Sequence, residues 1–462
     1  MYDYDLLVIG AGPGGQTAAL RAAKLGKTVA VAEAREPGGT CVNRGCVSTK
    51  TLLHSSSLYR AAAEGAAIGV HAEGLRADLG EIFQNKRRVA QTLSQGVESM
   101  FRSAKIALLR GRAKISAPHW AEIRGADGAV SEVSAESILI ATGAAPIRLP
   151  LPGMELPGVI TSEELLEGPD RLYRSIVIVG GGVIGIEFAC FFSDLGCEVT
   201  VLEGLDRLLP MLDRELGQNL ALILKKRGVR VCTGALVERI EQTETGLRVH
   251  FAAKGKPDFA DGEAVLCAVG RRAAWEELFA EGLAPELDGR ILKVDERFET
   301  SIPSIYAIGD VASPTQLAHV AAAQGQAFAE QLCGLGPQTD LSIVPSCVYC
   351  RPEIAVVGLT EAEAKERGIP VKSGKCVLGG NARTIIEDPG RCFMKVLANA
   401  ETGQILGAQL MCPDAPDMIS QISQAIANRM TPRQLLRAMR PHPSFEEALS
   451  DALADLAAKL EK

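Results

Sequence analysis

The chain has 462 residues, of which 47% are hydrophobic and 23% charged, a composition typical of a globular protein with a large core. Its length suggests about three domains, and its net charge of −7 gives no indication of nucleic acid or an anionic membrane surface as a partner. Acids stand where a secretion signal would carry bases, and glycines and Glu187 interrupt the most apolar stretch, SIVIVGGGVIGIEFACFF. We therefore expect neither a signal peptide nor a membrane span.

The first predicted elements form a βαβ unit over residues 5–33, DLLVIGAGPGGQTAALRAAKLGKTVAVAE. Its glycines follow the GxGxxG pattern directly after the strand. Gly10 makes the turn, Gly12 lets a pyrophosphate approach the backbone, and Gly15 lets helix and strand pack closely. The helix N-terminus attracts the anion, and Glu33 follows where a carboxylate accepts hydrogen bonds from ribose hydroxyl groups. The unit predicts a dinucleotide site.

The next stretch, GGTCVNRGCVSTK at residues 38–50, places Cys41 and Cys46 five positions apart. On an ideal helix the Cα atoms of such residues lie about 8.6 Å apart, whereas a disulfide requires roughly 4.4 to 6.8 Å. The two cysteines can therefore bond only where the backbone departs from a helix, and the neighbouring Gly38, Gly39 and Gly45 allow this. A disulfide over so short a loop would be a poor structural staple, because it removes little chain entropy.

Metal binding and redox chemistry are the other roles open to this pair. A metal site would need further ligands, and Cys347 and Cys350 could supply two. They lie in a strand-like stretch between prolines, where we interpret them as core and face positions, so we expect no metal. Cys46 stands at the expected start of a helix, whose dipole lowers a thiol pKa, and Lys50 follows on the same face. These residues favour a redox pair.

The middle of the chain alternates between helical and strand-like sequence. Residues 51–103 are expected to be helical and 105–149 to form strands, and PLPGMELPGV marks a boundary near residue 150. Residues 291–310 return to strand-like sequence, and from about residue 340 strands at VPSCVYC, EIAVVGL and RCFMKVLA precede C-terminal helices.

A second βαβ unit, residues 175–203, repeats the plan of the first. Gly180, Gly182 and Gly185 form its GxGxxG pattern, and Glu203 stands where Glu33 stands in the first unit. An acid there suits a free 2′-hydroxyl and repels a 2′-phosphate, so we predict NAD(H) rather than NADP(H). The alternative is that Glu203 is only a solvated acid at a strand end, and Arg207 lies nearby.

These elements predict an α/β fold with two Rossmann-like dinucleotide-binding domains and a third, C-terminal α+β domain. The predicted segments are 1–149 and 273–338 for the first domain, 150–272 for the second and 339–462 for the third.

Near the C-terminus, His442 stands between Pro441 and Pro443, which restrict the backbone and aim the imidazole. One interpretation of Ser444 and Glu447 is a capping box, S-x-x-E, for the last helix. The other makes His442 a general base and Glu447 its orienting carboxylate. The second interpretation gains weight only because a cysteine pair in the same chain needs a base.

The twelve cysteines are scattered, without the short spacings of a secreted disulfide scaffold. We infer a reducing cytoplasm, where a disulfide is a working one. Most of the cysteines lie in apolar runs, where they act as small hydrophobes, such as Cys190, Cys232, Cys267 and Cys392.

Taken together, the motifs resemble those of the dihydrolipoamide dehydrogenases in the flavoprotein pyridine nucleotide–disulfide oxidoreductase family. The resemblance covers essentially the whole chain, through VIGAGPGG, GGTCVNRGCVSTK, ILIATGAAP, VGGGVIGIEFA, AVGRR, IYAIGD, PEIAVVGLTE and HPSFEE. It implies FAD on the first unit and NAD on the second. It also implies that the C-terminal α+β domain is a dimerisation domain, which forms a homodimer with the histidine of one subunit serving the disulfide of the other. It also implies oxidation of dihydrolipoamide carried by a partner protein of a 2-oxo acid dehydrogenase, acetoin or glycine cleavage system.

The resemblance implies site residues at matching positions. Cys41 would exchange with dihydrolipoamide, Cys46 would face the flavin, and Lys50 would lie near the flavin and pair with Glu187. The residues that would bind FAD are Gly10, Gly12, Gly14, Gly15, Glu33, Gly39, Thr40, Lys50, Ala113, Thr142, Gly143, Asp310, Ala318 and His319. Those that would bind NAD are Gly180, Gly182, Val183, Ile184, Gly185, Glu203 and Gly270.

The sequence departs from the usual pattern of the family at several positions. Ser48 stands where proline is common, and RRAAW replaces the usual RRPNT. After the histidine, threonine, leucine and serine are replaced by Ser444, Phe445 and Glu446.

Several rivals within the family remain. A glutathione reductase would carry basic residues where Glu203 stands, and a mercuric reductase would carry a vicinal cysteine pair near its end. A quinone or metal-ion reductase would use the same flavin. A non-catalytic flavoprotein subunit would need neither the cysteine pair nor Lys50 and His442, which are present.

Overall fold

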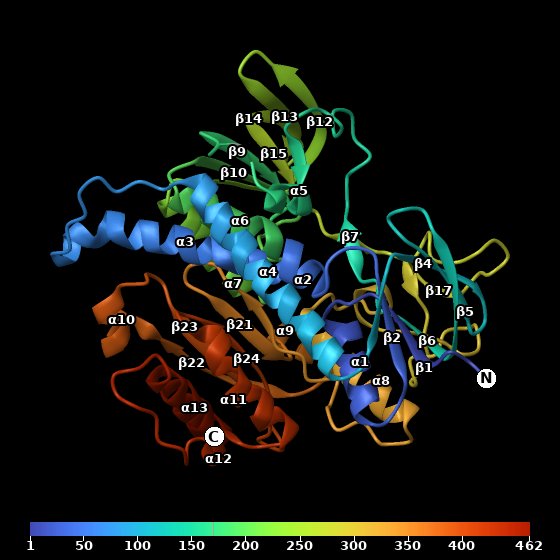
Figure 1. The fold of residues 1–462 in the computed structure, drawn as a ribbon. Helices are drawn as coiled ribbons and strands as arrows, with labels where there is room; N and C mark the ends of the chain where they lie inside the picture. Colours follow the sequence, from blue (N-terminus) through green and yellow to red (C-terminus); the bar gives the residue numbers. More distant parts are fainter. Residues whose placement is uncertain (170) are drawn as a thin grey trace.

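The computed structural model describes residues 1–169 and 171–462, which form a mixed α/β structure with three main sheets (Figure 1). The first sheet has the strand order β3-β2-β1-β6-β5-β4, with β19 paired to β6. Its β3, β2, β1, β6 and β19 run parallel, whereas β6, β5 and β4 pair antiparallel. The bounds are β1 (Tyr4–Ile9), β2 (Val29–Glu33), β3 (Ala107–Arg110), β4 (Arg112–Ala117), β5 (Trp120–Arg124), β6 (Val130–Ile140) and β19 (Ile305–Ala307).

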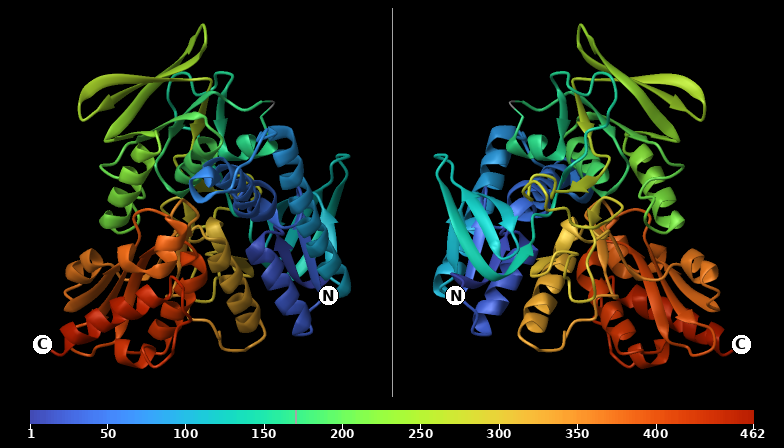
Figure 2. Two further views of the ribbon diagram at one scale, coloured as in Figure 1. Left: turned by 90° about the vertical axis from the view of Figure 1, so that its left-hand side faces the viewer. Right: turned by 90° about the vertical axis from the view of Figure 1, so that its right-hand side faces the viewer.

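Two helices pack closely on this first sheet. The first, α1 (Pro13–Lys24), connects β1 to β2, and α8 (Ala318–Leu332) lies beside it (Figure 2). The approach depends on glycines, because a Cβ atom added at Gly325 would lie 2.3 Å from the carbonyl oxygen of Gly14. The two helix N-termini are thereby held side by side.

The second sheet is entirely parallel, with the order β11-β10-β9-β15-β8. A three-stranded antiparallel sheet, β12-β13-β14, follows β11 in the chain. The bounds are β8 (Val159–Thr161), α5 (Ser162–Glu167), β9 (Ser175–Val179), α6 (Val183–Asp194), β10 (Glu198–Glu203), α7 (Arg214–Lys226), β11 (Arg230–Thr233), β12 (Ala235–Thr243), β13 (Gly246–Ala253), β14 (Lys256–Gly262) and β15 (Ala264–Cys267).

The third sheet is antiparallel, with the order β20-β21-β24-β23-β22, and α11 and α13 pack on it. Figure 1 shows this orange and red part of the chain below the green second sheet. The bounds are β20 (Ser346–Val348), β21 (Ile354–Gly358), α9 (Glu361–Glu366), β22 (Val371–Val377), α10 (Ala382–Glu387), β23 (Phe393–Asn399), β24 (Ile405–Met411), α11 (Ala415–Ala427), α12 (Pro432–Leu435) and α13 (Glu447–Leu460).

Three helices between β2 and β3 join these parts. The second and third, α3 and α4, pack on each other, and α3 also packs on α6 of the second unit. One hydrophobic core continues from Leu52 on α3 through the second sheet to residues such as Val348 and Phe393 of the third. The remaining bounds are α2 (Gly39–Arg44), α3 (Cys46–Glu64), α4 (Leu79–Ser103), β7 (Ala144–Pro146), β16 (Arg271–Ala273), β17 (Leu287–Asp288) and β18 (Ile291–Leu292), with 3-10 turns at Gly65–Ile68, Gly309–Val311 and Leu378–Gly380.

The predicted fold class is confirmed: two βαβ units lie in separate sheets, and an α+β unit follows. The three expected strands before the C-terminal helices form β20, β21 and β23, and they are joined by β22 and β24, which were not predicted from the sequence. The division of the chain into domains after residues 149, 272 and 338 stays a proposal. It is supported by sheet membership, since β19 returns to the first sheet after the second is complete.

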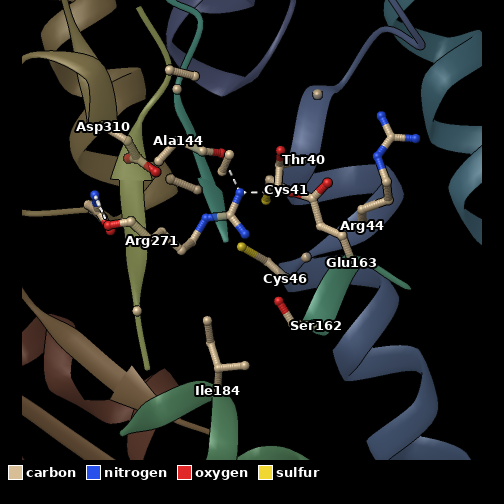
Figure 3. Close-up of a pocket in the computed structure, with 18 of the residues that line it drawn as sticks. Thr40, Cys41, Arg44, Cys46, Ala144, Ser162, Glu163, Ile184, Arg271 and Asp310 are labelled. Carbon is tan, nitrogen blue, oxygen red and sulfur yellow. Dashed lines mark hydrogen bonds and ion pairs between the residues drawn. The ribbon is translucent and has the colours of Figure 1, made fainter. Parts of the chain in front are cut away.

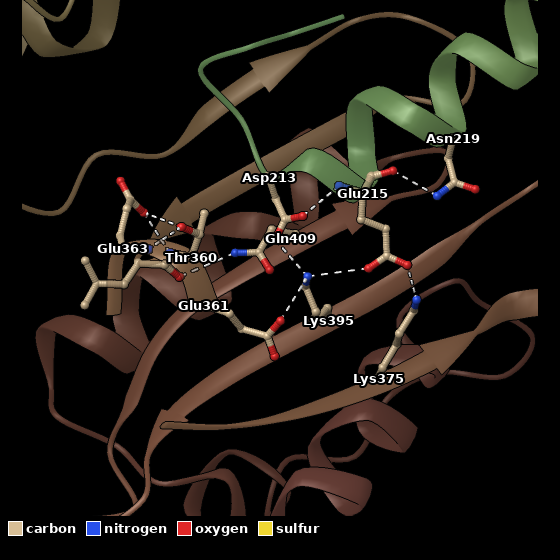
Figure 4. Close-up of polar contacts among 10 residues, drawn as sticks. Asp213, Glu215, Asn219, Thr360, Glu361, Glu363, Lys375, Lys395 and Gln409 are labelled. Atoms are coloured by element: carbon tan, nitrogen blue, oxygen red, sulfur yellow. Dashed lines mark hydrogen bonds and ion pairs between the residues drawn. The ribbon is translucent and has the colours of Figure 1, made fainter. Parts of the chain in front are cut away.

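A buried lysine joins the second unit to the third sheet (Figure 4). Lys395 on β23 is only 6% exposed and donates to Asp213 Oδ2 at 2.8 Å, with Glu215 Oε2 at 3.5 Å and Glu361 Oε2 at 3.8 Å. Burial opposes its charge, but the hydrogen bond to Asp213 and the charges of the three carboxylates outweigh this and raise the pKa of Lys395. Lys375 pairs with Glu215 from the rim of the same cluster.

We expect Lys395→Met to lower the midpoint of thermal unfolding by about 5 °C or more, because it leaves Asp213 and Glu215 without their buried counter-charge. Lys375→Met is the matched control and should cost about 2 °C or less, since its side chain is 35% exposed. The stabilisation from a raised lysine pKa is complete below the unfolded value of roughly 10.4 and is lost as the pH rises through the folded value. The gap between wild type and Lys395→Met should therefore hold from neutral to mildly alkaline pH. Equal shifts in the two variants would contradict this account.

Candidate active site

A single cavity of about 2130 Å³ lies where the first unit, the second unit and β20 meet. Of the predicted site residues, four do not line it: Gly15, Gly185, His442 and Glu447. The predicted residues that do line it are Gly10, Gly12, Gly14, Glu33, Gly39, Thr40, Cys41, Cys46, Lys50, Ala113, Thr142, Gly143, Gly180, Gly182, Val183, Ile184, Glu187, Glu203, Gly270, Asp310, Ala318 and His319.

The two cysteines stand on either side of a helix break. The helix α2 ends at Arg44, and Gly45, with φ −154° and ψ −121°, separates it from α3, which begins at Cys46. A Cβ atom at Gly45 would lie 2.9 Å from the Thr40 carbonyl oxygen, so the break is tight against the preceding turn. The backbone therefore departs from a helix where a bond between Cys41 and Cys46 requires it to.

Ser48 stabilises this helix break through hydrogen bonds of its side chain. It is fully buried, and its hydroxyl group donates to the carbonyl oxygens of Val42 at 3.0 Å and Asn43 at 2.9 Å. The first turn of α3 is thus tied to the end of α2. At the position where the family commonly has proline, the serine provides its own restraint on the loop.

The cysteine thiols differ in their affinity for a proton. A hydrogen bond from Cys41, and then the charge of Lys50, lower the pKa of Cys46 to about 7 against the effect of burial. The hydrogen bond to Cys46, burial and the charge of Cys46 raise the pKa of Cys41. In the reduced pair, Cys46 is therefore the sulfur that ionises first, while Cys41 keeps its proton.

The ammonium group of Lys50 lies one turn along α3 from Cys46 and pairs with the second unit. Its Nζ lies 2.8 Å from Glu187 Oε1 and 2.7 Å from Oε2. Glu187 on α6 is only 3% exposed, so its carboxylate depends on this partner. The structure brings the two residues together as the resemblance implied.

The two glycine loops are built alike and fit a dinucleotide. A Cβ atom at Gly10 or Gly180 would lie 2.4 Å from a carbonyl oxygen, of Ala141 or Ala268 respectively, so neither loop tolerates a side chain there. At the second glycine of each loop, Gly12 and Gly182, a Cβ atom would meet nothing within 4 Å, which leaves an open cradle at the cavity wall. The helices that follow, α1 and α6, have no side-chain cap, so their first N–H groups are free to bind phosphate oxygens.

The third glycines lie behind the cavity. A Cβ atom at Gly15 would lie 1.9 Å from the Gly10 carbonyl oxygen, and one at Gly185 would lie 2.0 Å from that of Gly180. Both residues therefore serve the packing of helix on strand.

Glu33 and Glu203 end their strands in equivalent surroundings. Glu33 accepts the N–H groups of Ala11 at 2.7 Å and Arg35 at 2.8 Å. Glu203 accepts those of Gly181 at 2.6 Å and Leu205 at 2.7 Å. Each carboxylate is fixed at the cavity wall by the loop it faces, with further lone pairs for ribose hydroxyl groups.

On the opposite wall, Asp310 and the N-terminus of α8 face the cavity. Burial raises the pKa of Asp310, and the charge of Arg271 opposes the rise. His319 on the first turn of α8 contacts the Pro345 carbonyl oxygen through Nε2 at 2.8 Å, which ties this helix to the segment before β20.

The sequence reading missed several residues that shape the cavity. Figure 3 shows the guanidinium group of Arg271 directed at Ala144 and Glu163, with Glu163 Oε1 at 3.0 Å. Arg271 directly follows Gly270, so its position in AVGRR was a usable signal, whereas nothing in the local sequence marks Glu163. Tyr349 also lines the cavity, and its stretch was considered only for metal ligands.

His442 and Glu447 lie together at the surface of the third unit. His442 Nδ1 is 2.9 Å from Glu447 Oε1, and the His442 side chain is 72% exposed. The N–H of Ser444 and then the contact with His442 lower the pKa of Glu447. Within one chain the histidine does not reach the cavity that contains Cys41.

The capping-box interpretation of Ser444 is wrong. The last helix begins at Glu447 with Glu446 as its N-cap, so Ser444 stands too early in the chain. Its hydroxyl group donates instead to the Pro441 carbonyl oxygen at 2.7 Å, while its N–H donates to Glu447 Oε2 at 3.0 Å. Ser444 therefore closes the loop that carries His442.

Residues 1–169 and 171–462 contain neither a cluster of metal ligands nor a membrane-spanning helix. Within these ranges no three histidine, cysteine, aspartate or glutamate side chains are grouped so that they could hold a metal ion. Over the same part of the chain, no helix has the length and apolar character needed to cross a bilayer.

Comparison with known proteins agrees with this geometry. Residues 4–325 match the model of the pyridine nucleotide-disulphide oxidoreductases. The chain belongs to this family. Residues 344–453 match the family's dimerisation domain, which supports a homodimer formed through the third unit.

Relatives within the family are similar over nearly their whole length. The chain is 36% identical to a dihydrolipoyl dehydrogenase of Bacillus subtilis, over 97% of each chain. It is 34% identical to that of Geobacillus stearothermophilus, over 97% of this chain and 95% of the relative.

Solved structures of the family share the fold. A Cu(II) complex of the HOCl-induced flavoprotein disulfide reductase RclA from Escherichia coli matches with a TM-score of 0.87 and 30% identity, over 98% of this chain and 99% of that one. LpdA from Mycobacterium tuberculosis matches with a TM-score of 0.89 and 28% identity, over 97% and 99%.

Proposed function

We propose that the protein is a dihydrolipoyl dehydrogenase, which oxidises protein-bound dihydrolipoamide to lipoamide and reduces NAD+. One observation carries the proposal: a cysteine pair across a helix break shares a cavity with two dinucleotide loops. Enzymes that do this chemistry need a disulfide that opens reversibly beside an electron carrier. The curated relatives of the chain in Bacillus subtilis and Geobacillus stearothermophilus carry the same activity in their names.

The unequal thiols support Cys41 as the sulfur that the substrate attacks. A substrate thiolate that attacks Cys41 forms a mixed disulfide and expels Cys46 as a thiolate. Exchange is faster when the leaving thiol has the lower pKa, and the pKa of Cys46 lies at about 7. The second substrate thiol then attacks the sulfur bound to Cys41, so that lipoamide leaves as a disulfide and both cysteines are reduced.

His442 is proposed as the base that takes the proton from the substrate thiol. Glu447 orients it through Nδ1 at 2.9 Å, which leaves Nε2 to accept the proton. Because His442 is exposed on its own chain, we assign it to the cysteine pair of the partner subunit in the homodimer.

The cofactors are FAD on the first unit and NAD on the second. The open cradles at Gly12 and Gly182, the uncapped helices α1 and α6, and the carboxylates of Glu33 and Glu203 fit two dinucleotides. When bound, FAD supplies the transfer of an electron pair from the reduced cysteines to NAD+ as hydride. Lys50, held by Glu187, supplies a fixed positive charge beside Cys46.

The test is a steady-state assay of the purified protein with dihydrolipoamide and NAD+. We expect turnover with free dihydrolipoamide and a higher kcat/KM with a lipoylated carrier domain, since the lipoyl group is proposed to arrive on a partner protein. Parallel assays with glutathione disulfide plus NADPH, a quinone and Cu(II) cover the rival reductases. A kcat/KM for any of these above that for dihydrolipoamide would overturn the proposal.

Glu203 should set the choice of nicotinamide coenzyme. We expect the wild type to prefer NAD+ strongly, and Glu203→Ala to narrow the ratio of kcat/KM for NAD+ over NADP+ by about 10-fold or more, because repulsion of the 2′-phosphate is removed. Glu198→Ala is the control, since Glu198 is exposed at the other end of β10. A wild-type preference for NADP+ would refute the role given to Glu203.

A further inference from the structure

Side chains from three separate parts of the chain meet at the ammonium group of Lys50. Besides its two contacts with Glu187, Nζ lies 4.6 Å from the centroid of the Tyr349 ring. The backbone N–H of Tyr349 donates to Glu187 Oε1 at 3.1 Å. Lys50 lies on α3, Glu187 on α6 and Tyr349 directly after β20, so the third sheet completes a contact begun by the other two units.

Lys50 has the more exposed side chain of the ion pair. Its side chain is 31% exposed and has a flexible four-carbon stem, whereas the Glu187 side chain is 4% exposed. Glu187 holds the ammonium group from one side only. The face of an aromatic ring attracts a cation, and Tyr349 presents such a face to Lys50.

Tyr349 keeps a neutral ring under the conditions of the reaction. Burial, and then the neighbouring Cys347 and Glu353, raise the pKa of Tyr349 to about 12. The phenol therefore stays protonated at neutral pH, and its interaction with Lys50 is that of a ring face with an ammonium group. A phenylalanine ring would offer the same face.

We propose that Tyr349 is a positioning residue of the redox centre, whose ring confines the ammonium group of Lys50 against Glu187, one helical turn along α3 from Cys46. The charged or titratable groups that act on Cys46 are Cys41 from α2, Lys50 from its own helix and Glu187 from α6. Of these, Lys50 is the one that favours the thiolate by its charge. Without the ring, Lys50 spends part of its time in the open cavity, and its effect on Cys46 weakens.

The experiment titrates the Cys46 thiolate in the holoenzyme. Cys41→Ser leaves Cys46 unable to form the disulfide, and a thiolate next to oxidised flavin gives a long-wavelength charge-transfer absorbance that can be followed with pH. In this background we expect Tyr349→Leu to raise the apparent pKa of Cys46 by about half a unit, a roughly 3-fold loss of thiolate below the pKa. Tyr349→Phe should leave the titration unchanged. Both variants keep the backbone N–H that Glu187 accepts.

A second pair of variants separates the ring's action on Lys50 from simple packing. In a Lys50→Met background, Tyr349→Leu should shift the Cys46 titration no further. An equal shift with and without Lys50, no shift in Tyr349→Leu, or the same shift in Tyr349→Phe would each overturn the inference. The effect of Tyr349 on the Cys46 titration does not depend on the proposed function, and only its importance for catalysis rests on that function. Because the titration uses no lipoyl substrate, its failure is distinguishable from a failure of the dihydrolipoamide assay.

Discussion

Cys41→Ser is expected to lower kcat for dihydrolipoamide oxidation by NAD+ at least about 10³-fold, because no mixed disulfide can form at residue 41. Serine keeps the size and the hydrogen-bonding ability of the side chain, so the fold and the cofactor sites should persist. The measurement is steady-state turnover, together with the ratio of FAD to protein and the thermal midpoint. We expect the last two to match those of the wild type.

Cys333→Ser is the matched control. Cys333 follows α8 and does not line the cavity, so its replacement should leave kcat within about 2-fold. Full dihydrolipoamide turnover by Cys41→Ser would show that electrons reach the flavin without the disulfide. A loss of FAD in Cys41→Ser would instead mark the residue as structural.

The local architecture could be predicted because it depends on residues close together in the chain. Gly10 and Gly180 need a positive φ, of 107° and 111°, and a backbone carbonyl lies within 2.4 Å of any added Cβ atom. Alternating and helical apolar patterns flank both glycines, so the two βαβ units are evident from the sequence. The need for a non-helical backbone near Gly45 and the start of a helix at Cys46 were both predicted, whereas the short helix α2 that precedes the break is a finding of the structure.

Long-range contacts could not be predicted in the same way. Nothing in the local sequence distinguishes Lys395 from other lysines in strands. Only the fold places its Nζ 2.8 Å from Oδ2 of Asp213, which is 182 residues away. Tyr349 and Lys50 are likewise brought together by the docking of the third sheet on α3 and α6. Strands β12 and β14 expose many of their residues and show no clear period, whereas β13 between them alternates the buried Leu247, Val249 and Phe251 with less buried residues. A single sequence holds little information about which distant side chains meet.

The position of a residue relative to the other subunit is a further property that the structure of a single chain does not give. The sequence marks His442 by its prolines and by Glu447, and the structure confirms that contact at 2.9 Å. The same structure leaves the histidine 72% exposed and away from the cysteine cavity. Its proposed role therefore requires a second copy of the chain.

Mixing two inactive variants tests this requirement. His442→Ala alone should lower kcat at least about 100-fold by removing the base, while FAD content stays normal. If each site combines Cys41 of one subunit with His442 of the other, a heterodimer of Cys41→Ser and His442→Ala subunits contains one intact site and one doubly defective site. Random pairing of equal amounts makes half of the dimers mixed, so co-refolded or co-expressed variants should recover about a quarter of the wild-type activity.

Sites formed within a single subunit would behave differently. Each subunit of the mixed dimer would then carry one defect in its own site, and activity would stay at the level of the separate variants. His442→Gln serves as a further control, because glutamine can fill the position and accept a hydrogen bond but cannot take up the proton. A loss of kcat in His442→Gln alone that is as large as that in His442→Ala would assign the defect to proton transfer by the imidazole, which Glu447 holds in place.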